Sequence, residues 1–216
     1  GYDGSISEMY SAWVAGCEVV MLTKPELRSG PDLLPILKER EVTALFCPPV
    51  LLSTLSSRPS TDLPYPICRY VIPAGEAFPA SLVRPWSEGR RQIINTYGPT
   101  EASTDTSRQL LRPDEPVTIG TPFAGVSYLI LSPRDLQPVP VGQEGELCIG
   151  GCQLARGYRN LEEVTAEKFV DHPEFGRLYR SGDRCHVDPD SGRVHFHGRL
   201  DTQLKVRGFR VETQPI

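Results

Sequence analysis

The chain has 216 residues, of which 39% are hydrophobic and 23% charged, and a formal net charge of −4. This length is enough to bury a hydrophobic core in one or two domains. The acidic balance argues against nucleic-acid and membrane partners, which need a basic surface, and no apolar run approaches the ~18 residues of a membrane span.

Helix and strand signals alternate over the first 112 residues. A helix is predicted over residues 5–16, where Ser5 and Glu8 have the spacing of a capping box, and a strand over 18–22. The predicted elements then follow as helix 31–41, strand 42–46, helix 50–57, strand 70–72, helix 79–88 and strand 92–94. This alternation predicts an α/β fold with a parallel sheet and flanking helices.

Three of these strands end in turns that carry polar or small residues. The carboxyl ends of parallel strands meet at one edge of a sheet, where α/β proteins bind ligands. We therefore expect one crevice there, lined by Phe46, Ala74, Gly75, Thr96 and Glu101.

After residue 112 the pattern changes to short apolar segments separated by glycine and proline turns. Strands are predicted over residues 117–119, 126–131, 145–149 and 194–196. This spacing is typical of a smaller antiparallel, β-barrel-like subdomain, which we place at residues 113–198 after an α/β subdomain at 1–112.

The six cysteines form no CxxC pair and lie among apolar neighbours, which predicts free buried thiols in a reducing, cytoplasmic location. A zinc site from Cys148, Cys152 and Cys185 is disfavoured, because their spacing fits no common pattern. His195 and His197 alternate on a predicted strand and are interpreted as ordinary strand residues rather than metal ligands.

Residues 95–101, with the sequence NTYGPTE, follow the last strand of the α/β part. This stretch combines an aromatic ring, a Gly-Pro turn, a hydroxyl and a carboxylate. An aromatic face can stack on a base, a hydroxyl can bond a phosphate oxygen, and a carboxylate can hold Mg²⁺. Together these groups suggest a nucleotide site.

The same stretch resembles the adenine and phosphate motif of adenylate-forming enzymes. Four more segments agree with that family in order and spacing: 3–9, 145–158, 179–183 and 198–208. The whole chain resembles an adenylation domain of a nonribosomal peptide synthetase. The resemblance implies an internal fragment that ends in a hinge and the start of a C-terminal α+β lid at 199–216. The family's phosphate loop and catalytic lysine would lie outside it, so we expect the fragment alone to be inactive.

The resemblance implies that ATP or AMP and Mg²⁺ bind along these motifs. Tyr97 would stack on adenine, Thr100 would bond the α-phosphate and Glu101 would hold Mg²⁺. Asp183 would accept both ribose hydroxyls, and Arg199 would reach the ribose or phosphate. Further nucleotide contacts would come from Gly75, Glu76, Ala77, Asn95, Thr96 and Gly98. Asp201 would be the hinge, and Lys205 would face the second reaction step.

Local structure offers an alternative for several of these residues, and Lys205 could belong to an exposed basic strand edge. Thr100 could cap a helix with Glu101 exposed, Asp183 could form an Asx-turn, and Arg199 with Asp201 could be a surface salt bridge.

Asp3 is the residue that indicates the substrate class. The resemblance implies that it pairs with the α-ammonium of an amino acid, since a buried cation needs such a partner. An N-terminal cap of the following helix is the alternative. The rest of the implied substrate pocket is Gly4, Ser7, Phe46, Ile72, Ala74, Thr96, Thr104 and Asp105.

The implied function is ATP-dependent activation of an amino acid as its adenylate. Transfer to the phosphopantetheine thiol of a carrier domain would follow, with carrier and condensation domains as partners. A stand-alone acyl- or aryl-CoA ligase and a noncatalytic nucleotide-binding module remain the alternatives, and Asp3 favours the first function.

Overall fold

The computed structural model describes residues 3–27, 30–201, 203–206 and 209–212. The chain divides into two compact units. The first unit comprises Gly1–Asn95, Gln109–Val117 and Lys205–Phe209, and the second comprises Thr96–Arg108, Thr118–Leu204 and Arg210–Ile216. The predicted boundaries after residues 112 and 198 remain predictions about subdomains.

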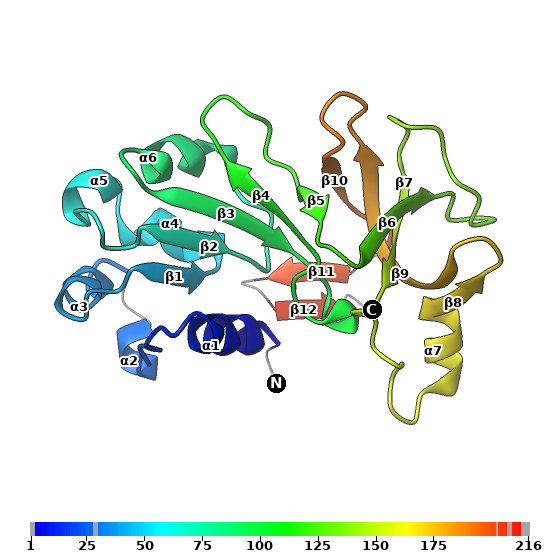
Figure 1. Cartoon of the computed structure of the whole chain (residues 1–216), viewed down its shortest axis with the longest axis horizontal. Coiled ribbons are helices and arrows are strands. Elements are labelled where there is room, and N and C mark those ends of the chain that lie inside the picture. The colour runs from blue at the N-terminus through cyan, green and yellow to red at the C-terminus, as the bar shows by residue number, and fades with distance from the viewer. Residues whose placement is uncertain (1–2, 28–29, 202, 207–208, 213–216) are drawn as a thin grey trace. The chain divides into compact units, whose positions relative to one another are not determined.

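Strands β1 (Ala44–Cys47), β2 (Tyr70–Pro73) and β3 (Gln92–Tyr97) are parallel, as predicted. Figure 1 shows them side by side with helices around them. The helices of this part are α1 (Gly4–Val14), α2 (Lys24–Leu27), α3 (Leu33–Glu39), α4 (Pro49–Leu55), α5 (Pro59–Asp62), η1 (Ala80–Leu82) and α6 (Val83–Ser87). Strands β4 (Ser107–Leu111) and β5 (Thr121–Pro122) pair antiparallel and complete a mixed sheet ordered β1-β2-β3-β4-β5.

The core of the first unit lies between these strands and three of the helices. Leu33 of α3, Leu52 of α4 and Trp86 of α6 are fully buried in the same cluster as Val71 of β2 and Ile93 of β3. Burial alternates along the three parallel strands, and Leu45, Val71 and Ile93 belong to the cluster that packs on these helices.

Two predictions near the N-terminus are wrong. Residues 18–22 form an irregular segment after Gly16 instead of a strand. Met21 in this segment is 72% exposed, so its apolar side chain does not mark a buried strand. The capping box is absent, since Ser5 and Glu8 lie inside α1. Asp3 occupies the N-cap position, but its side chain makes no capping hydrogen bond.

The second unit contains a curled antiparallel sheet, the half-barrel expected from the sequence. Its main strands are β6 (Val126–Leu131), β7 (Gly145–Gly151), β9 (Gly176–Val187) and β10 (Val194–Arg199), ordered β10-β9-β7-β6 (Figure 1). Strand β8 (Phe169–His172) pairs with β9, and η2 (Thr100–Ala102) and α7 (Glu162–Lys168) are short helices. Strands β11 (Gln203–Val206) and β12 (Phe209–Glu212) pair with each other.

The strand predicted over 117–119 is also wrong. Ile119 is buried in the same hydrophobic cluster as Val194, but it belongs to no strand. Its N–H donates to the Val194 carbonyl at 2.9 Å, and Gly120 forms only an isolated bridge to Val194.

All six cysteines are free. Four of them are buried as predicted, but Cys17 and Cys152 are exposed, which corrects the expectation that every thiol is buried. Within the described ranges, no helix combines the length and apolar character needed to cross a bilayer.

Candidate functional site

The polar segment that follows β3 folds as a tight loop. A Cβ atom at Gly98 would lie 1.9 Å from the Thr104 carbonyl oxygen, so only glycine fits this close approach. The Thr106 N–H donates to the Tyr97 carbonyl at 2.8 Å and closes the loop. Between them the chain makes one 3₁₀ turn, η2, which ends at Ser103 in the left-handed region. These contacts fix the backbone of the loop that carries Tyr97 and Glu101.

Tyr97 and Asp183 lie together although 86 residues separate them in the sequence. The Tyr97 hydroxyl donates to Oδ2 of Asp183, a carboxylate in β9 that is only 3% exposed. The other oxygen, Oδ1, accepts from Nη1 of Arg199 at 2.9 Å. The structure thus brings together three residues that the family motifs single out separately.

The Tyr97 ring packs edge-on against Tyr128, with ring centroids 6.4 Å apart. Burial, and then the negative charge of Asp183, raise the pKa of Tyr97 well above its usual value. The phenol therefore stays protonated and acts as a hydrogen-bond donor to Asp183.

Arg199 connects Asp183 with the predicted hinge residue Asp201. Its Nε and Nη2 donate to the two carboxylate oxygens of Asp201 at 2.9 and 2.6 Å, and its Nη1 also donates to the Ser181 carbonyl at 2.8 Å. Burial alone would lower the pKa of Arg199, but the hydrogen bond to Asp201 and the charge of Asp183 raise it overall. Arg199 therefore forms the salt bridge to Asp201 that was the alternative for this pair, and it also forms one to the buried carboxylate of Asp183.

The backbone that presents Asp183 is held by a buried network. Gly182 has φ +72° and donates its N–H to Oε1 of Glu146 at 3.1 Å. The other Glu146 oxygen accepts from Nε and Nη2 of Arg180 at 3.0 and 2.6 Å. Ser181 donates its hydroxyl to the Leu147 carbonyl at 2.6 Å. Asp183 therefore lies in a strand, with its carboxylate on Tyr97 and Arg199, rather than in an Asx-turn.

Glu101 is buried, with 6% of its surface exposed, which excludes the alternative of an exposed carboxylate. Its Oε1 accepts the hydroxyl of Tyr158 at 2.5 Å, and its backbone carbonyl accepts the Ala155 N–H at 2.8 Å. The neighbouring Thr100 is exposed.

Four residues that support this arrangement received no role from the sequence: Tyr128, Glu146, Tyr158 and Arg177. Tyr158 and Glu146 lie in segment 145–158, which resembles a family motif, so the sequence could have singled them out. Arg177 donates to the carbonyls of Ala155 and Arg156, both at 2.7 Å, and nothing in its local sequence indicated that contact.

Most other predicted site residues belong to the first unit. Gly75, with φ +88°, and the following Glu76 and Ala77 come after β2, and Asn95 is buried in β3. The implied substrate residues of the first unit are Asp3, Gly4, Ser7, Phe46, Ile72 and Ala74, while Thr96, Thr104 and Asp105 belong to the second. Lys205 lies on β11, but its side chain is outside the described residues. The roles of all these residues remain predictions.

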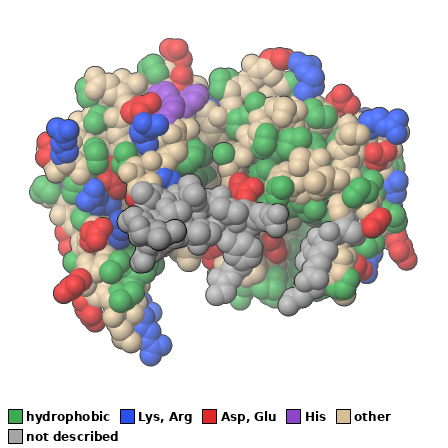
Figure 2. Space-filling view, turned by 180° about the vertical axis from the view of Figure 1, so that it is seen from behind, with side chains coloured by type: hydrophobic (Ala, Val, Ile, Leu, Met, Phe, Trp, Pro, Cys, Tyr) green, Lys and Arg blue, Asp and Glu red, His purple; other side chains and the backbone are tan. Residues whose placement is uncertain are grey.

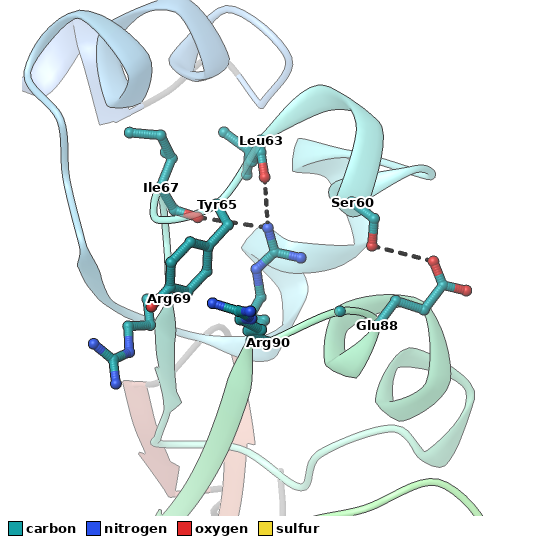
Figure 3. Close-up of a pocket in the computed structure, with 9 residues that line it drawn as sticks. Ser60, Leu63, Tyr65, Ile67, Arg69, Glu88 and Arg90 are labelled. Carbon is teal, nitrogen blue, oxygen red and sulfur yellow. Dashed lines mark hydrogen bonds between the residues drawn. The ribbon is translucent and has the colours of Figure 1, made fainter.

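A cavity of about 70 Å³ in the first unit is lined by residues of the segments that precede β2 and β3 (Figure 3). Arg69 and Arg91, which line it, precede β2 and β3, whereas the motif residues follow the carboxyl ends of those strands. Arg91 donates to the carbonyls of Cys68 and Leu63 at 2.9 and 2.8 Å, which ties the loop before β2 to the start of β3. We interpret this cavity as a structural junction rather than the functional site.

Three histidines of β9 and β10 form one patch, visible in purple in Figure 2. The ring of His186 stacks on those of His195 and His197, each with centroids 4.8 Å apart. Across the part of the chain that the structure describes, no group of three histidine, cysteine, aspartate or glutamate residues could hold a metal ion. His195 and His197 lie on β10, so the prediction that they are strand residues is confirmed.

Comparison with known proteins finds synthases and biosynthesis proteins among the relatives of this chain. Tyrocidine synthase 1 of Brevibacillus parabrevis is 40% identical over 219 residues, and novobiocin biosynthesis protein H of Streptomyces niveus is 39% identical over 216. Both alignments cover 98% of this chain, but only 19% and 34% of the relatives' lengths. The chain therefore spans a minor part of each relative.

Solved structures of similar proteins also match this chain. IdnL1 matches with a TM-score of 0.88 at 28% identity, over 98% of this chain and 45% of that chain. Holo-AB3403, a four-domain nonribosomal peptide synthetase bound to AMP and glycine, matches with a TM-score of 0.82 at 30% identity, over 97% of this chain and 16% of that one. The sequence model of the AMP-binding enzyme family matches residues 1–159, most of the chain. The chain belongs to the family of AMP-binding enzymes.

Proposed function

We propose that the protein carrying this chain activates an amino acid with ATP and passes it to a carrier domain in nonribosomal peptide synthesis. In the first step the substrate carboxylate attacks the α-phosphate, which gives an aminoacyl-adenylate and pyrophosphate. In the second step a phosphopantetheine thiol attacks the acyl carbon and releases AMP. The observation that carries this proposal is the buried Asp183 carboxylate held between Tyr97 and Arg199 in a member of the AMP-binding family.

Asp183 suits a ribose because its carboxylate only accepts hydrogen bonds, and each oxygen has more than one lone pair. Its bonds to Tyr97 and Arg199 therefore leave lone pairs that can accept from the two ribose hydroxyls. In this proposal Arg199 holds the carboxylate in place, and Tyr97 offers its ring to adenine while its hydroxyl orients Asp183. Thr100, which is exposed on η2, donates its hydroxyl to the α-phosphate.

Glu101 fits the requirements of a Mg²⁺ ligand. Mg²⁺ prefers oxygen donors and is usually held by one or two carboxylates together with substrate phosphates, so a single buried carboxylate is sufficient. When bound, Mg²⁺ would neutralise charge on the phosphates. Glu101 in turn is fixed by Tyr158 and by the backbone contact to Ala155.

For the amino-acid substrate, we propose that Asp3 pairs with the α-ammonium group. The absence of a capping hydrogen bond from its side chain supports this role over the capping alternative. Replacing Asp3 by alanine should therefore impair amino-acid activation far more than ATP binding, and equal loss of both would indicate structural damage instead.

Carrier and condensation domains are the proposed partners, and the cytoplasm the proposed location. The solved structure of PA1221, described as a nonribosomal peptide synthetase protein with adenylation and peptidyl carrier domains, supports a carrier partner by its similarity, with a TM-score of 0.82. We also propose that Lys205 acts in the thioester step.

The test is ATP–pyrophosphate exchange by the full-length protein against panels of amino acids, aryl acids and fatty acids. Exchange that depends on one amino acid supports the proposal. Exchange with aryl or fatty acids only would replace it by the acyl- or aryl-CoA ligase alternative. Nucleotide binding without exchange on any panel would favour the noncatalytic module.

A further inference from the structure

The carboxylate of Glu101 has a defined neighbour from a distant part of the sequence. Tyr158, 57 residues later, donates its hydroxyl to Oε1 of Glu101 at 2.5 Å. Glu101 itself is 6% exposed, so this hydrogen bond is largely shielded from water. The two segments are also joined through the backbone, since the Ala155 N–H donates to the Glu101 carbonyl at 2.8 Å.

Tyr158 is held in place independently of Glu101. Its N–H donates to Oγ1 of Thr165 at 2.9 Å, and its ring packs edge-on against Phe169 with centroids 5.8 Å apart. Gly157 before it has φ +144°, and a Cβ there would lie 2.4 Å from Cγ2 of Thr165. The segment is thus closely packed on α7, and the hydroxyl reaches Glu101 from a fixed position.

Arg177 fixes the chain just before Tyr158. Its Nη1 and Nη2 donate to the carbonyls of Ala155 and Arg156, both at 2.7 Å, while its guanidinium lies 4.6 Å from the Phe169 ring centroid. The same aromatic ring therefore contacts both Tyr158 and Arg177. Because these contacts come from β8, β9 and α7, the position of the phenol is set by the fold of the second unit rather than by the loop alone.

We propose that Tyr158 is a positioning residue for the metal site, which fixes the orientation of the Glu101 carboxylate so that its remaining lone pairs face Mg²⁺. This inference rests on the proposed function, in which Glu101 holds the ion. A carboxylate oxygen that accepts one hydrogen bond keeps a second lone pair, so the phenol and a cation can share the group. Partners of this kind orient metal ligands, and their removal typically lowers metal affinity or activity by about 10- to 100-fold.

The competing explanation is that Tyr158 only fills space beside Phe169. The variant Tyr158→Phe separates the two, since it keeps the ring and removes the hydroxyl. A space-filling role predicts no change in the dependence on Mg²⁺. A positioning role predicts weaker Mg²⁺ binding while the amino-acid KM at saturating Mg²⁺ stays the same.

The experiment measures Mg²⁺ binding to the AMP-loaded full-length protein by calorimetry, and ATP–pyrophosphate exchange as a function of free Mg²⁺. For Tyr158→Phe we expect the half-saturating Mg²⁺ concentration to rise about 10-fold or more. The matched control is Tyr70→Phe, which also removes the hydroxyl of a partly buried tyrosine but one on β2 in the first unit, and its half-saturating concentration should stay that of the wild type. An unchanged Mg²⁺ dependence in folded Tyr158→Phe overturns the inference.

Two further variants test the same inference. In a Glu101→Gln background, Tyr158→Phe should cause no additional loss, and an additive loss would contradict the proposed connection. If Tyr158→Phe does not fold, Thr165→Val removes the acceptor of the Tyr158 N–H and should raise the half-saturating Mg²⁺ concentration by a smaller factor, whereas no rise would overturn the inference. Absence of Mg²⁺-dependent exchange in the wild type would instead refute the proposed function itself.

Discussion

Replacing Tyr97 by phenylalanine tests the hydrogen bond at the centre of the site. The change removes the hydroxyl that donates to Asp183 and keeps the ring against Tyr128. Because the acceptor is a charged carboxylate, 3% exposed, loss of this bond should cost about 1.5–3 kcal/mol. At about 1.4 kcal/mol per factor of ten, the opening equilibrium of the surrounding structure should rise roughly 10- to 150-fold.

Hydrogen exchange measured by mass spectrometry on the full-length protein reads this opening locally, in peptides that cover β9. Tyr70→Phe is the matched control, since Tyr70 lies on β2 in the first unit, and it should leave exchange in β9 unchanged. In an Asp183→Ala background, Tyr97→Phe should cost much less than in the wild type, because its acceptor is already gone. If Tyr97→Phe speeds exchange in β9 no more than the control does, or if the two losses simply add, the reasoning is refuted.

Three other predictions follow from the second unit. Glu146→Gln removes the charge that faces Arg180 and should cost about 1–3 kcal/mol, seen as faster exchange in β7; unchanged exchange there would contradict the role of this pair. Gly98→Ala brings a Cβ to 1.9 Å from the Thr104 oxygen and should cost at least about 1–3 kcal/mol, so a variant with the wild-type Tm would contradict the close approach. Burial and then the neighbouring His186 lower the pKa of His195, so the unfolded chain binds this proton more readily. The stability present above about pH 6.5 is then lost as the pH falls below it, and His195→Gln should reduce that loss between about pH 7 and pH 5. An equal loss in the variant would refute the linkage.

The regular elements that the sequence predicted correctly are those with a simple apolar pattern. Strand β6 begins and ends where predicted, at Val126 and Leu131. Its apolar run lies between turns, and all of it pairs with β7. Segment 117–119 also carries apolar residues but forms no strand, because only Ile119 bonds to Val194 and the following Gly120 forms an isolated bridge. Apolar character predicts burial in both cases, and the hydrogen-bonding partner decides whether a strand forms.

Strand β9 went unpredicted because its sequence is polar. The residues Ser181, Gly182 and Asp183 are typical of a turn, but the strand is held by partners on other elements, such as Glu146 for Arg180. A local pattern does not reveal partners that lie some 34 residues away. The same reason hid the contact between Tyr158 and Glu101, since both residues were recognised in motifs whereas only the fold shows that they meet.

Nucleotide affinity of an Asp183→Asn variant tests the central claim most directly. The asparagine side chain keeps the shape of Asp183 but presents an NH₂ group in place of one acceptor oxygen. AMP binding by the full-length protein is measured by calorimetry, beside an Asp188→Asn control on the turn after β9. Affinity should weaken about 10-fold or more in Asp183→Asn and stay unchanged in the control. Equal AMP affinity in the wild type and in Asp183→Asn would contradict the assignment of this carboxylate to the ribose.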